Sequence, residues 1–456
     1  METNQKSFLA NLLNSNTTRL IMIGALTLFL LIPLFLVKGL INERAVRQSE
    51  VIREINSKWG NEVFFYGPIL KIPYVTYVQS EVYDKKTGKS VIERIPEQHY
   101  AFFFPEELKN TSKVQTEIKK RNNYESVVFT SQMDFSGRYI QPDFSSKYVS
   151  DTDIQWEKAT ILIRTTNLSS IKNSVKMLFS GKEYVFEPIY EAQANEDYSY
   201  YSENNGYRAV SSLETPFFNV KDHFENGNFS FSITYDGSSK IGIVPIGKVT
   251  ESTIKSDWKD PSFSGSFLPF KKDITNDGFL ADWKILHINR PFSQQTFGSL
   301  PDIGKYAFEV DFVIPVDEYQ QNERAAKYGF LVIGLTFLIF FLIQTISKIK
   351  IHIFQYTMIG LALTMFYTLL ISITEHSSFS KAYLMASVMI ILLIGLYSIS
   401  ILKNRKFPMF IVASLSALYG FIYVIIQLEN YALLVGSVGL FLILALVMYV
   451  SRKIEW

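Results

Sequence analysis

Residues 328–346 read YGFLVIGLTFLIFFLIQTI, a run without a single charged side chain. The hydrocarbon core of a bilayer is about 30 Å thick, and an α-helix needs about 20 apolar residues to cross it. The 456-residue chain contains five more charge-free runs of this kind: Leu20–Val37, Ile353–Ile373, Ala382–Leu402, Met409–Gln427 and Tyr431–Val450. The sequence therefore predicts six transmembrane helices, one near the N-terminus and five near the C-terminus.

The charges are segregated along the chain. Residues 41–327 carry 34 Lys and Arg against 39 Asp and Glu, a balance of −5, whereas the remainder carries +7. A soluble enzyme does not separate apolar runs from charge in this way, and a mildly acidic polar part argues against nucleic-acid binding. The chain has no cysteine, which excludes disulfides, cysteine-ligated zinc, iron–sulfur clusters and thiol catalysis. We expect a membrane protein with one large water-facing domain, no cofactor and no nucleic-acid partner.

Basic residues in the short loops predict the orientation, because loops on the cytoplasmic side carry an excess of Lys and Arg. With a cytoplasmic N-terminus, the outside loops carry only Lys381. We therefore predict a cytoplasmic segment 1–19, a helix over 20–40, a periplasmic domain over 41–327, a five-helix bundle over 328–450 and a cytoplasmic tail 451–456 of a bacterial inner-membrane protein. The inside segments then carry nine basic residues: Lys6, Arg19, Lys348, Lys350, Lys403, Arg405, Lys406, Arg452 and Lys453.

The first hydrophobic run has two interpretations. It is short and contains Pro33, so we expect the helix to run on past Lys38, whose ammonium group reaches toward the interface. The alternative is a cleaved signal peptide with Lys6 and Arg19 as its basic flank. Residues 37–42 offer no small-x-small cleavage site, which favours a retained anchor.

The domain between the first two membrane helices is predicted to be a mostly antiparallel β structure, which makes the chain an α+β membrane protein. A helix over Glu43–Trp59, ended by Gly60, leads into this domain. The two ends of the domain are expected to lie close together. Asp236-Gly237 indicates a hairpin, and the size allows one sandwich or two domains. Strands are predicted at Ile69–Val78, Tyr100–Phe104, Ser126–Thr130, Thr160–Arg164, Tyr184–Phe186, Phe229–Tyr235 and Lys240–Val244.

Motifs for known chemistries are absent from the sequence. There is no Walker A, GxGxxG, GxSxG or HExxH spacing, and the five histidines are scattered singly. We therefore predict neither catalytic nor metal-binding residues. The tyrosine-rich stretch Glu191–Gly206 is the best candidate for a mobile loop or an internal boundary. Its aromatic side chains could hold a sugar or a peptide, although packing is the favoured interpretation.

A candidate interaction surface lies within Ser256–Trp283. Turn-forming glycines and prolines alternate there with aromatic residues, which predicts an ordered loop rather than a strand or helix, and ordered loops carry many binding surfaces. The alternative is a loop that only closes a sheet. The candidate residues are Asp257, Trp258, Pro261, Phe263, Gly265 and Trp283.

A second candidate lies at the outer end of the third membrane helix, where Glu375 and His376 precede Lys381. A carboxylate and an imidazole at this depth could pair with each other, bind a lipid headgroup or contact the outer domain. The alternative is a set of polar residues that merely end the helix.

A series of short stretches along the chain forms a recognisable set: Leu31-Ile32-Pro33-Leu34, Asn42-Glu43-Arg44, Trp59-Gly60, Gly67-Pro68-Ile69-Leu70, residues 256–269, 278–283, 310–320 and 323–329, Ile351-His352, Gln355-Tyr356, residues 360–363, Phe366-Tyr367 and Glu375-His376. In these stretches and in their order, over nearly its whole length, the chain resembles the CreD family of bacterial inner-membrane proteins. The family usually has a proline directly after the histidine of its Ile-His-Pro segment, where this chain has Ile353, and residues 165–174 and 190–212 also diverge.

The resemblance implies a role in cell-envelope integrity and the envelope-stress response, in some bacteria under the CreBC two-component system, with links to β-lactam response and colicin tolerance. It implies no catalytic residue. We favour a non-enzymatic protein that contacts membrane lipids and recognises a wall, lipid or protein partner in the envelope. A transporter or lipid-handling protein is the alternative, disfavoured because the spans lack charged groups. A peptidoglycan-acting enzyme is the third interpretation.

Overall fold

A computed structural model describes residues 16–84, 89–189, 199–201, 207–209, 211–312, 314, 318–347, 349, 351–402, 406–428 and 431–452. The chain divides into two compact units. One unit joins Met1–Glu50 to Val316–Trp456 and is helical, and the other is Val51–Pro315 and is built from β-strands. The β-rich part is therefore one compact unit, a point that the sequence left open.

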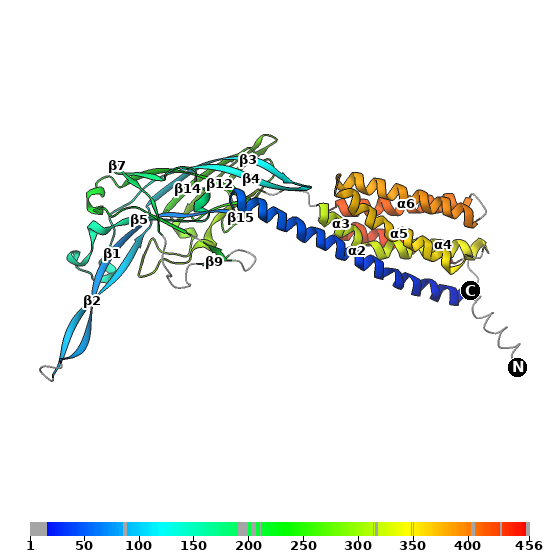
Figure 1. The fold of residues 1–456 in the computed structure, drawn as a ribbon, viewed down its shortest axis with the longest axis horizontal. Helices are drawn as coiled ribbons and strands as arrows, with labels where there is room; N and C mark the ends of the chain where they lie inside the picture. The colour runs from blue at the N-terminus through cyan, green and yellow to red at the C-terminus, as the bar shows by residue number, and fades with distance from the viewer. Residues whose placement is uncertain are drawn as a thin grey trace. The chain divides into compact units, whose positions relative to one another are not determined.

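Six helices in the described part of the chain are long and apolar enough to cross a membrane, one N-terminal and five C-terminal, as predicted. The first, α2, runs without a break through Pro33 and ends at Trp59, next to Gly60 as expected. Figure 1 shows the helices of the helical unit running side by side. Their bounds are α2 Asn16–Trp59, α4 Gly329–Ser347, α5 Ile353–Thr374, α6 Phe379–Leu402, α7 Lys406–Gln427 and α8 Ala432–Ser451, with the short α3 at Glu318–Lys327.

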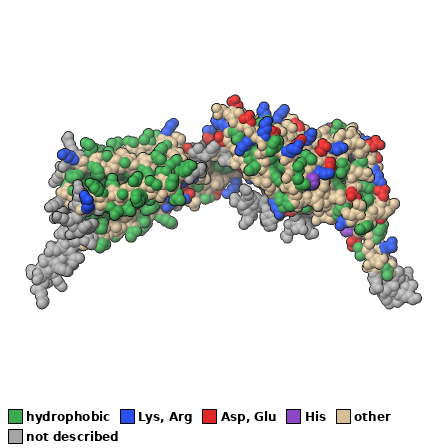
Figure 2. Space-filling view, turned by 180° about the vertical axis from the view of Figure 1, so that it is seen from behind, with side chains coloured by type: hydrophobic (Ala, Val, Ile, Leu, Met, Phe, Trp, Pro, Cys, Tyr) green, Lys and Arg blue, Asp and Glu red, His purple; other side chains and the backbone are tan. Residues whose placement is uncertain are grey.

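The surface of the helical unit is mostly apolar, whereas that of the β unit carries charges of both signs (Figure 2). Apolar side chains that face outward are stable only in lipid, because in water each would expose hydrocarbon surface. Inside the unit the helices approach closely at Gly360, where an added Cβ would lie 2.1 Å from Leu30 Cδ1. Small residues at such contacts are typical of helix packing in membranes.

The helices that flank the β unit in sequence meet at one end of α5. Arg44 Nε of α2 lies 3.3 Å from Glu375 Oε1, which follows α5 directly. Asn322 of α3 accepts a hydrogen bond from the Thr374 hydroxyl at 3.4 Å and is buried. The two points at which the chain leaves and re-enters the helical unit are thus close together, as the sequence predicted.

The β unit contains two large sheets that are mostly antiparallel. One has the order β15-β19-β13-β1-β5-β11-β8, with β2 beside β1 and β18 beside β2, and the other has the order β16-β17-β14-β3-β4-β12-β6-β7. In the described part there are two parallel pairs: β1 pairs with β13, and β3 pairs with β14. The strands are β1 Val63–Asp84, β2 Lys89–Phe103, β3 Glu107–Arg121, β4 Tyr124–Arg138, β5 Thr160–Thr165, β6 Lys176–Phe179, β7 Lys182–Val185, β8 Glu187–Ile189, β11 Ser211–Glu214, β12 Asn228–Ser238, β13 Lys240–Ile243, β14 Val249–Ser256, β15 Pro261–Gly265, β16 Lys271–Thr275, β17 Gly278–Leu286, β18 Gln295–Phe297 and β19 Phe308–Phe312.

Aromatic rings fill the space between the two sheets. Phe65 of β1 stacks on Phe135 of β4 with ring centroids 4.2 Å apart, and Phe135 stacks on Phe231 of β12 at 4.9 Å. Trp283 of β17 stacks on Phe308 of β19 at 5.0 Å. Because the Phe65–Phe135 and Trp283–Phe308 pairs join strands of opposite sheets, the unit is a sandwich with one shared core.

The predicted hairpin at Asp236-Gly237 is wrong. Both residues lie inside β12, which pairs with β4, and the next strand, β13, belongs to the other sheet. The chain changes sheets at Ser239, which has φ 63°. Gly237 is needed for space rather than for a turn, because a Cβ there would lie 2.5 Å from the ring of Phe129.

The predicted loop over Ser256–Trp283 is also wrong, because most of it forms β15, β16 and the first part of β17. The glycines stand at the ends of these strands. Gly265 has φ +81°, and a Cβ on Gly278 would lie 2.0 Å from the Ser256 carbonyl oxygen. The many glycines and prolines of this segment therefore indicate the ends of three strands and not one continuous loop.

The β1–β2 pair continues well beyond the sandwich as a two-stranded ribbon, visible in Figure 1. Strand β1 pairs with β5 only as far as Lys71, whereas its pairing with β2 continues to Asp84. Tyr77, Val78 and Ile95 on the ribbon are exposed. Most of the stretch Glu191–Gly206 lies outside the described residues, apart from β9 Ser199–Tyr201, which pairs with β10 Tyr207–Ala209.

Candidate functional site

A groove of about 500 Å³ crosses the outer face of the eight-stranded sheet, over β3, β4, β12, β6 and β7. Successive side chains of a strand point to opposite faces of its sheet, so the groove is lined by the side chains that alternate with the core. Strand β3 shows this directly, since its exposed Lys109 and Thr111 alternate with buried Leu108 and Asn110. The residues that line the groove are thus the outward-facing half of the side-chain alternation in these strands.

The lining of the groove is polar and carries both signs of charge. Hydroxyl groups come from Thr111, Ser136, Ser230 and Ser232, and Leu178 is an exposed apolar side chain among them. Ser136 and Ser230 face each other across β4 and β12. The charged lining residues are Lys109, Asp134, Lys176 and Glu183, of which Lys176 and Glu183 form an ion pair at 2.9 Å.

Hydroxyls, ammonium groups and carboxylates on a concave face can donate and accept hydrogen bonds to a polar polymer, such as a glycan or a peptide. Sequence reasoning missed this surface. Its residues come from five strands that are separated in the chain, and no motif connects them.

The first predicted interaction segment is packed rather than open. Asp257 accepts hydrogen bonds from the amide and the hydroxyl of Thr116, at 2.9 and 2.8 Å, and so ties the turn after β14 to β3. Trp258 and Trp283 are 9% and 1% exposed, and their indole nitrogens donate to the carbonyls of Asp260 and Phe267.

The rest of that segment forms strand β15. Pro261, Phe263 and Gly265 lie on this strand, and the Phe263 ring packs against Trp283 at 5.8 Å. The aromatic residues therefore build the core instead of lining an exposed loop. Any contact of this segment with a partner would involve its turns and the outer edge of β15.

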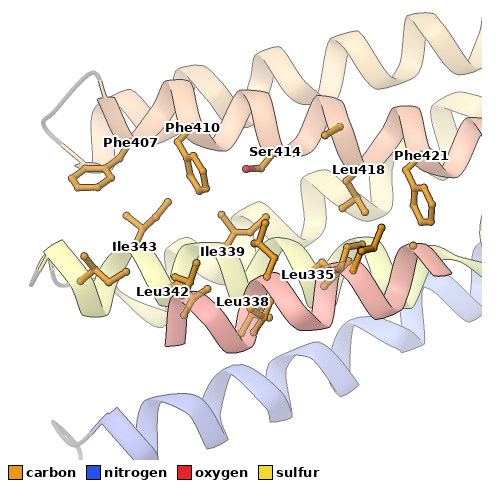
Figure 3. Close-up of a pocket in the computed structure, with 18 of the residues that line it drawn as sticks. Leu335, Leu338, Ile339, Leu342, Ile343, Phe407, Phe410, Ser414, Leu418 and Phe421 are labelled. Atoms are coloured by element: carbon orange, nitrogen blue, oxygen red, sulfur yellow. The ribbon is translucent and has the colours of Figure 1, made fainter. Parts of the chain in front are cut away.

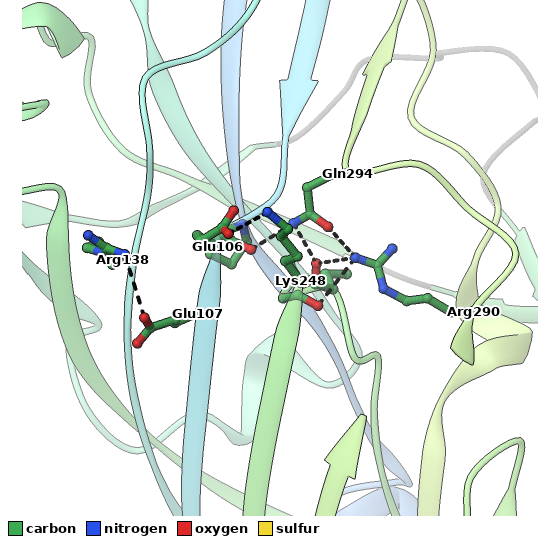
Figure 4. A network of polar contacts seen from close by, with 9 residues as sticks. Glu106, Glu107, Arg138, Lys248, Arg290 and Gln294 are labelled. Carbon is green, nitrogen blue, oxygen red and sulfur yellow. Dashed lines mark hydrogen bonds and ion pairs between the residues drawn. The ribbon is translucent and has the colours of Figure 1, made fainter. Parts of the chain in front are cut away.

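A buried cation lies at the junction of the sheets (Figure 4). Arg290 is 5% exposed, and its guanidinium donates to the carbonyl oxygens of Ile246, Gly247 and Phe292 and to the side-chain oxygen of Gln294. Burial lowers the pKa of Arg290 to about 10, so the group still carries its charge at neutral pH. Gln294 in turn donates to the Pro105 carbonyl at 2.7 Å.

The Arg290 network connects the segment after β13, the turn between β2 and β3, and the approach to β18. Nearby, Lys248 forms an ion pair at 2.6 Å with Glu106, which lies in the turn between β2 and β3. Since all four acceptors of Arg290 are neutral oxygens, its role is to satisfy buried carbonyls rather than to neutralise an acid. The sequence could not have predicted the Arg290 network, because its one signal is a single arginine before Pro291.

A second, partly buried cation links two strands of the nine-stranded sheet. Lys240 Nζ of β13 lies 2.8 Å from Glu309 and 3.2 Å from Asp311 of β19. Burial disfavours the charged ammonium, but hydrogen bonds to Glu309 and the charges of both carboxylates outweigh it, so the pKa of Lys240 is raised. These ion pairs link β13 to β19, the strand that pairs with β15.

In the helical unit, Glu375 does not pair with His376 but with Arg44, as described above. His376 and Lys381 are exposed, and within the described residues neither side chain has a hydrogen-bond or ion-pair partner. A headgroup contact by these residues stays a prediction. The partner of Glu375 was missed because it lies on α2, far away in the sequence.

A cavity of about 790 Å³ in the helical unit lies between α4, α7 and α8. Figure 3 shows Phe407, Phe410 and Phe421 of α7 facing Leu335, Ile339 and Ile343 of α4 across it. Among the described residues of its lining, Lys406 at the start of α7 is the one charged residue. Such a cavity accommodates hydrocarbon and offers no site for polar chemistry. Among the described residues, no group of three or more His, Asp and Glu could hold a metal ion.

Together the two units define a multi-pass membrane protein that carries a large β-sandwich between its first helix and the other five. The family model described as inner membrane protein CreD matches residues 15–456. Inner membrane protein CreD of Escherichia coli (strain K12) is 29% identical over 435 residues, which cover 94% of this chain and 91% of that relative. The chain therefore belongs to the CreD family of inner-membrane proteins.

The buried arginine gives a prediction about stability. Arg290→Met keeps most of the side-chain volume but removes four hydrogen bonds of a buried guanidinium, and the Phe292 carbonyl and the Gln294 side-chain oxygen lose this donor, which should destabilise the β unit by about 3 kcal/mol. Arg138→Met is the matched control, because Arg138 pairs with Glu107 at 3.6 Å with both side chains about half exposed, a pair worth at most about 1 kcal/mol. Thermal unfolding of the two variants measures the difference, and equal destabilisation would contradict the assigned role.

The Arg44–Glu375 pair gives a second prediction. Glu375→Arg should lower the melting temperature by placing like charges together, and the exchange Arg44→Glu with Glu375→Arg should restore it. The coupling should be about 0.2–1 kcal/mol, because the two side chains are 43% and 23% exposed. A double-mutant cycle on the purified full chain measures it, with His376→Ala as a control of unchanged stability. A coupling of zero would mean that the pair does not hold α2 against α5.

Proposed function

We propose that the chain is a non-enzymatic inner-membrane protein that contributes to cell-envelope integrity and the envelope-stress response. Its β unit recognises a wall or protein partner of the envelope in the groove of the eight-stranded sheet. Family membership supports the setting, and the groove is the observation that carries the recognition role. A polar concave surface of about 500 Å³, built by outward side chains of five strands, suits a polar polymer better than a lipid tail.

The orientation belongs to the same proposal. The count of nine basic residues in the inside segments against Lys381 outside supports cytoplasmic termini and a periplasmic β unit. An envelope partner would then meet the groove without crossing the membrane.

The absence of natural cysteines allows a clean test of the orientation. Ser230→Cys in the groove should react with a membrane-impermeant maleimide on intact spheroplasts. Arg452→Cys, at the end of α8, should react only after the membrane is permeabilised. The opposite pattern would place the groove in the cytoplasm and rule out a periplasmic partner.

Filling the groove tests the recognition role. Ser136→Phe with Ser230→Phe places two rings on facing positions, and this variant should lose most of its ability to complement a strain lacking the protein under β-lactam stress. Both positions are exposed, so stability should change by only about 0.5 kcal/mol and the protein should accumulate normally. The matched control is Gln79→Phe with Gln98→Phe, at exposed strand positions outside the groove, which should complement fully.

The alternative function, lipid handling, has one observation in its favour, the apolar cavity between α4, α7 and α8. Ser414→Phe reduces this cavity without changing the β unit. If this variant fails to complement while the filled groove complements normally at wild-type abundance, the groove proposal is rejected in favour of a lipid role.

A further inference from the structure

A second, smaller cavity lies at the end of the helical unit where α2 begins. Its volume is about 160 Å³, and it is lined by residues of α2, by the end of α4 and by the start of α5. Of the lining residues that the structure describes, four are polar, namely Arg19, Gln344, His352 and Tyr356, and none is acidic. Arg19 directly precedes the first charge-free run, which places the cavity at the level of the membrane interface.

Gln344 is a buried donor that faces this cavity. It is 4% exposed, and its side-chain oxygen accepts a hydrogen bond from the Tyr356 hydroxyl at 3.2 Å. That bond fixes the orientation of the amide, so its Nε2 is turned to donate, and within the described residues Nε2 has no acceptor.

His352 supplies another donor through its position as the N-cap of α5. Its Nδ1 accepts a hydrogen bond from the Phe354 amide at 3.2 Å, and its own amide donates to the Gln355 side chain at 2.9 Å. A neutral imidazole that accepts through Nδ1 carries its proton on Nε2. The start of a 22-residue helix adds the positive end of its dipole.

The described lining thus combines one guanidinium, an amide and an imidazole that each have an N–H to donate, and a helix N-terminus, with no carboxylate among these residues. This set matches an anion with several acceptor oxygens, and a guanidinium binds phosphate especially well. A volume of about 160 Å³ is below the roughly 300–1,000 Å³ of pockets that enclose a whole ligand, so only part of a larger molecule would enter. Met22, Ile23 and Ile353 provide an apolar border for an attached hydrocarbon chain.

We infer that this cavity binds the phosphate group of a membrane phospholipid, held by Arg19, Gln344 and His352, with Tyr356 as the residue that orients Gln344. The acyl chains lie outside the cavity in the bilayer. With the orientation proposed above, the lipid belongs to the cytoplasmic leaflet. This site is independent of the groove on the β unit.

The test uses the delipidated full-length protein in a neutral detergent. Phosphatidylglycerol is titrated, its binding is followed by native mass spectrometry, and the melting temperature is measured in parallel. Arg19→Gln and Gln344→Met should each weaken binding about tenfold or more, since each removes a hydrogen bond to an anion. Arg19→Lys should retain part of the affinity, because the charge remains but the planar fork is lost.

Three comparisons separate the sources of the effect. Arg452→Gln removes a charge outside the cavity and should bind like the wild type. Diacylglycerol, which has the chains but no phosphate, should not bind at this site. Inorganic phosphate should leave the melting temperature unchanged.

Two outcomes overturn the inference. Equal phosphatidylglycerol affinity in the wild type, Arg19→Gln and Gln344→Met would remove the site. A stabilisation by inorganic phosphate as large as that by the lipid, lost in both variants, would assign the cavity to a free anion and reject the phospholipid. Gln344→Met keeps the test valid if Arg19→Gln does not fold.

Discussion

The stack of Phe65, Phe135 and Phe231 is the contact on which the β unit depends, because it joins the two sheets at the centre of their shared core. Once Phe135 and Phe231 point inward, the alternation along β4 and β12 turns Ser136, Ser230 and Ser232 outward. The composition of the groove is therefore set by the same register that fills the core. A shift of one residue in either strand would exchange rings for hydroxyls on both faces.

The sequence was most informative where one physical constraint dominates. A helix in lipid must satisfy its backbone internally and must avoid charge, so six charge-free runs identified six helices. Strand positions were also found, because alternation and β-branched residues mark them, although β1 extends well past the predicted Val78. The hairpin at Asp236-Gly237 failed because a glycine beside the Phe129 ring has the same signature as a glycine in a turn.

The candidate sites could not be predicted in the same way, because they are made by contacts between distant segments. Arg44 meets Glu375, and Arg290 meets the carbonyls of Ile246 and Gly247, without any spacing in the sequence that indicates it. Trp258 and Trp283 were assigned to an exposed surface because glycines and prolines surround them. Only the packing shows that both indoles belong to the core.

The projecting part of the β1–β2 hairpin has an energetic consequence. Its outer residues, such as Val78 and Ile95, pair across two strands but are not covered by the second sheet and are exposed. Two strands without a packed face are only marginally stable in water. Backbone amides of this ribbon should therefore exchange with solvent through local unzipping, while those near Phe65 exchange only when the whole sandwich opens. Strand β1 accordingly carries, along one continuous length, both strongly protected and weakly protected hydrogen bonds.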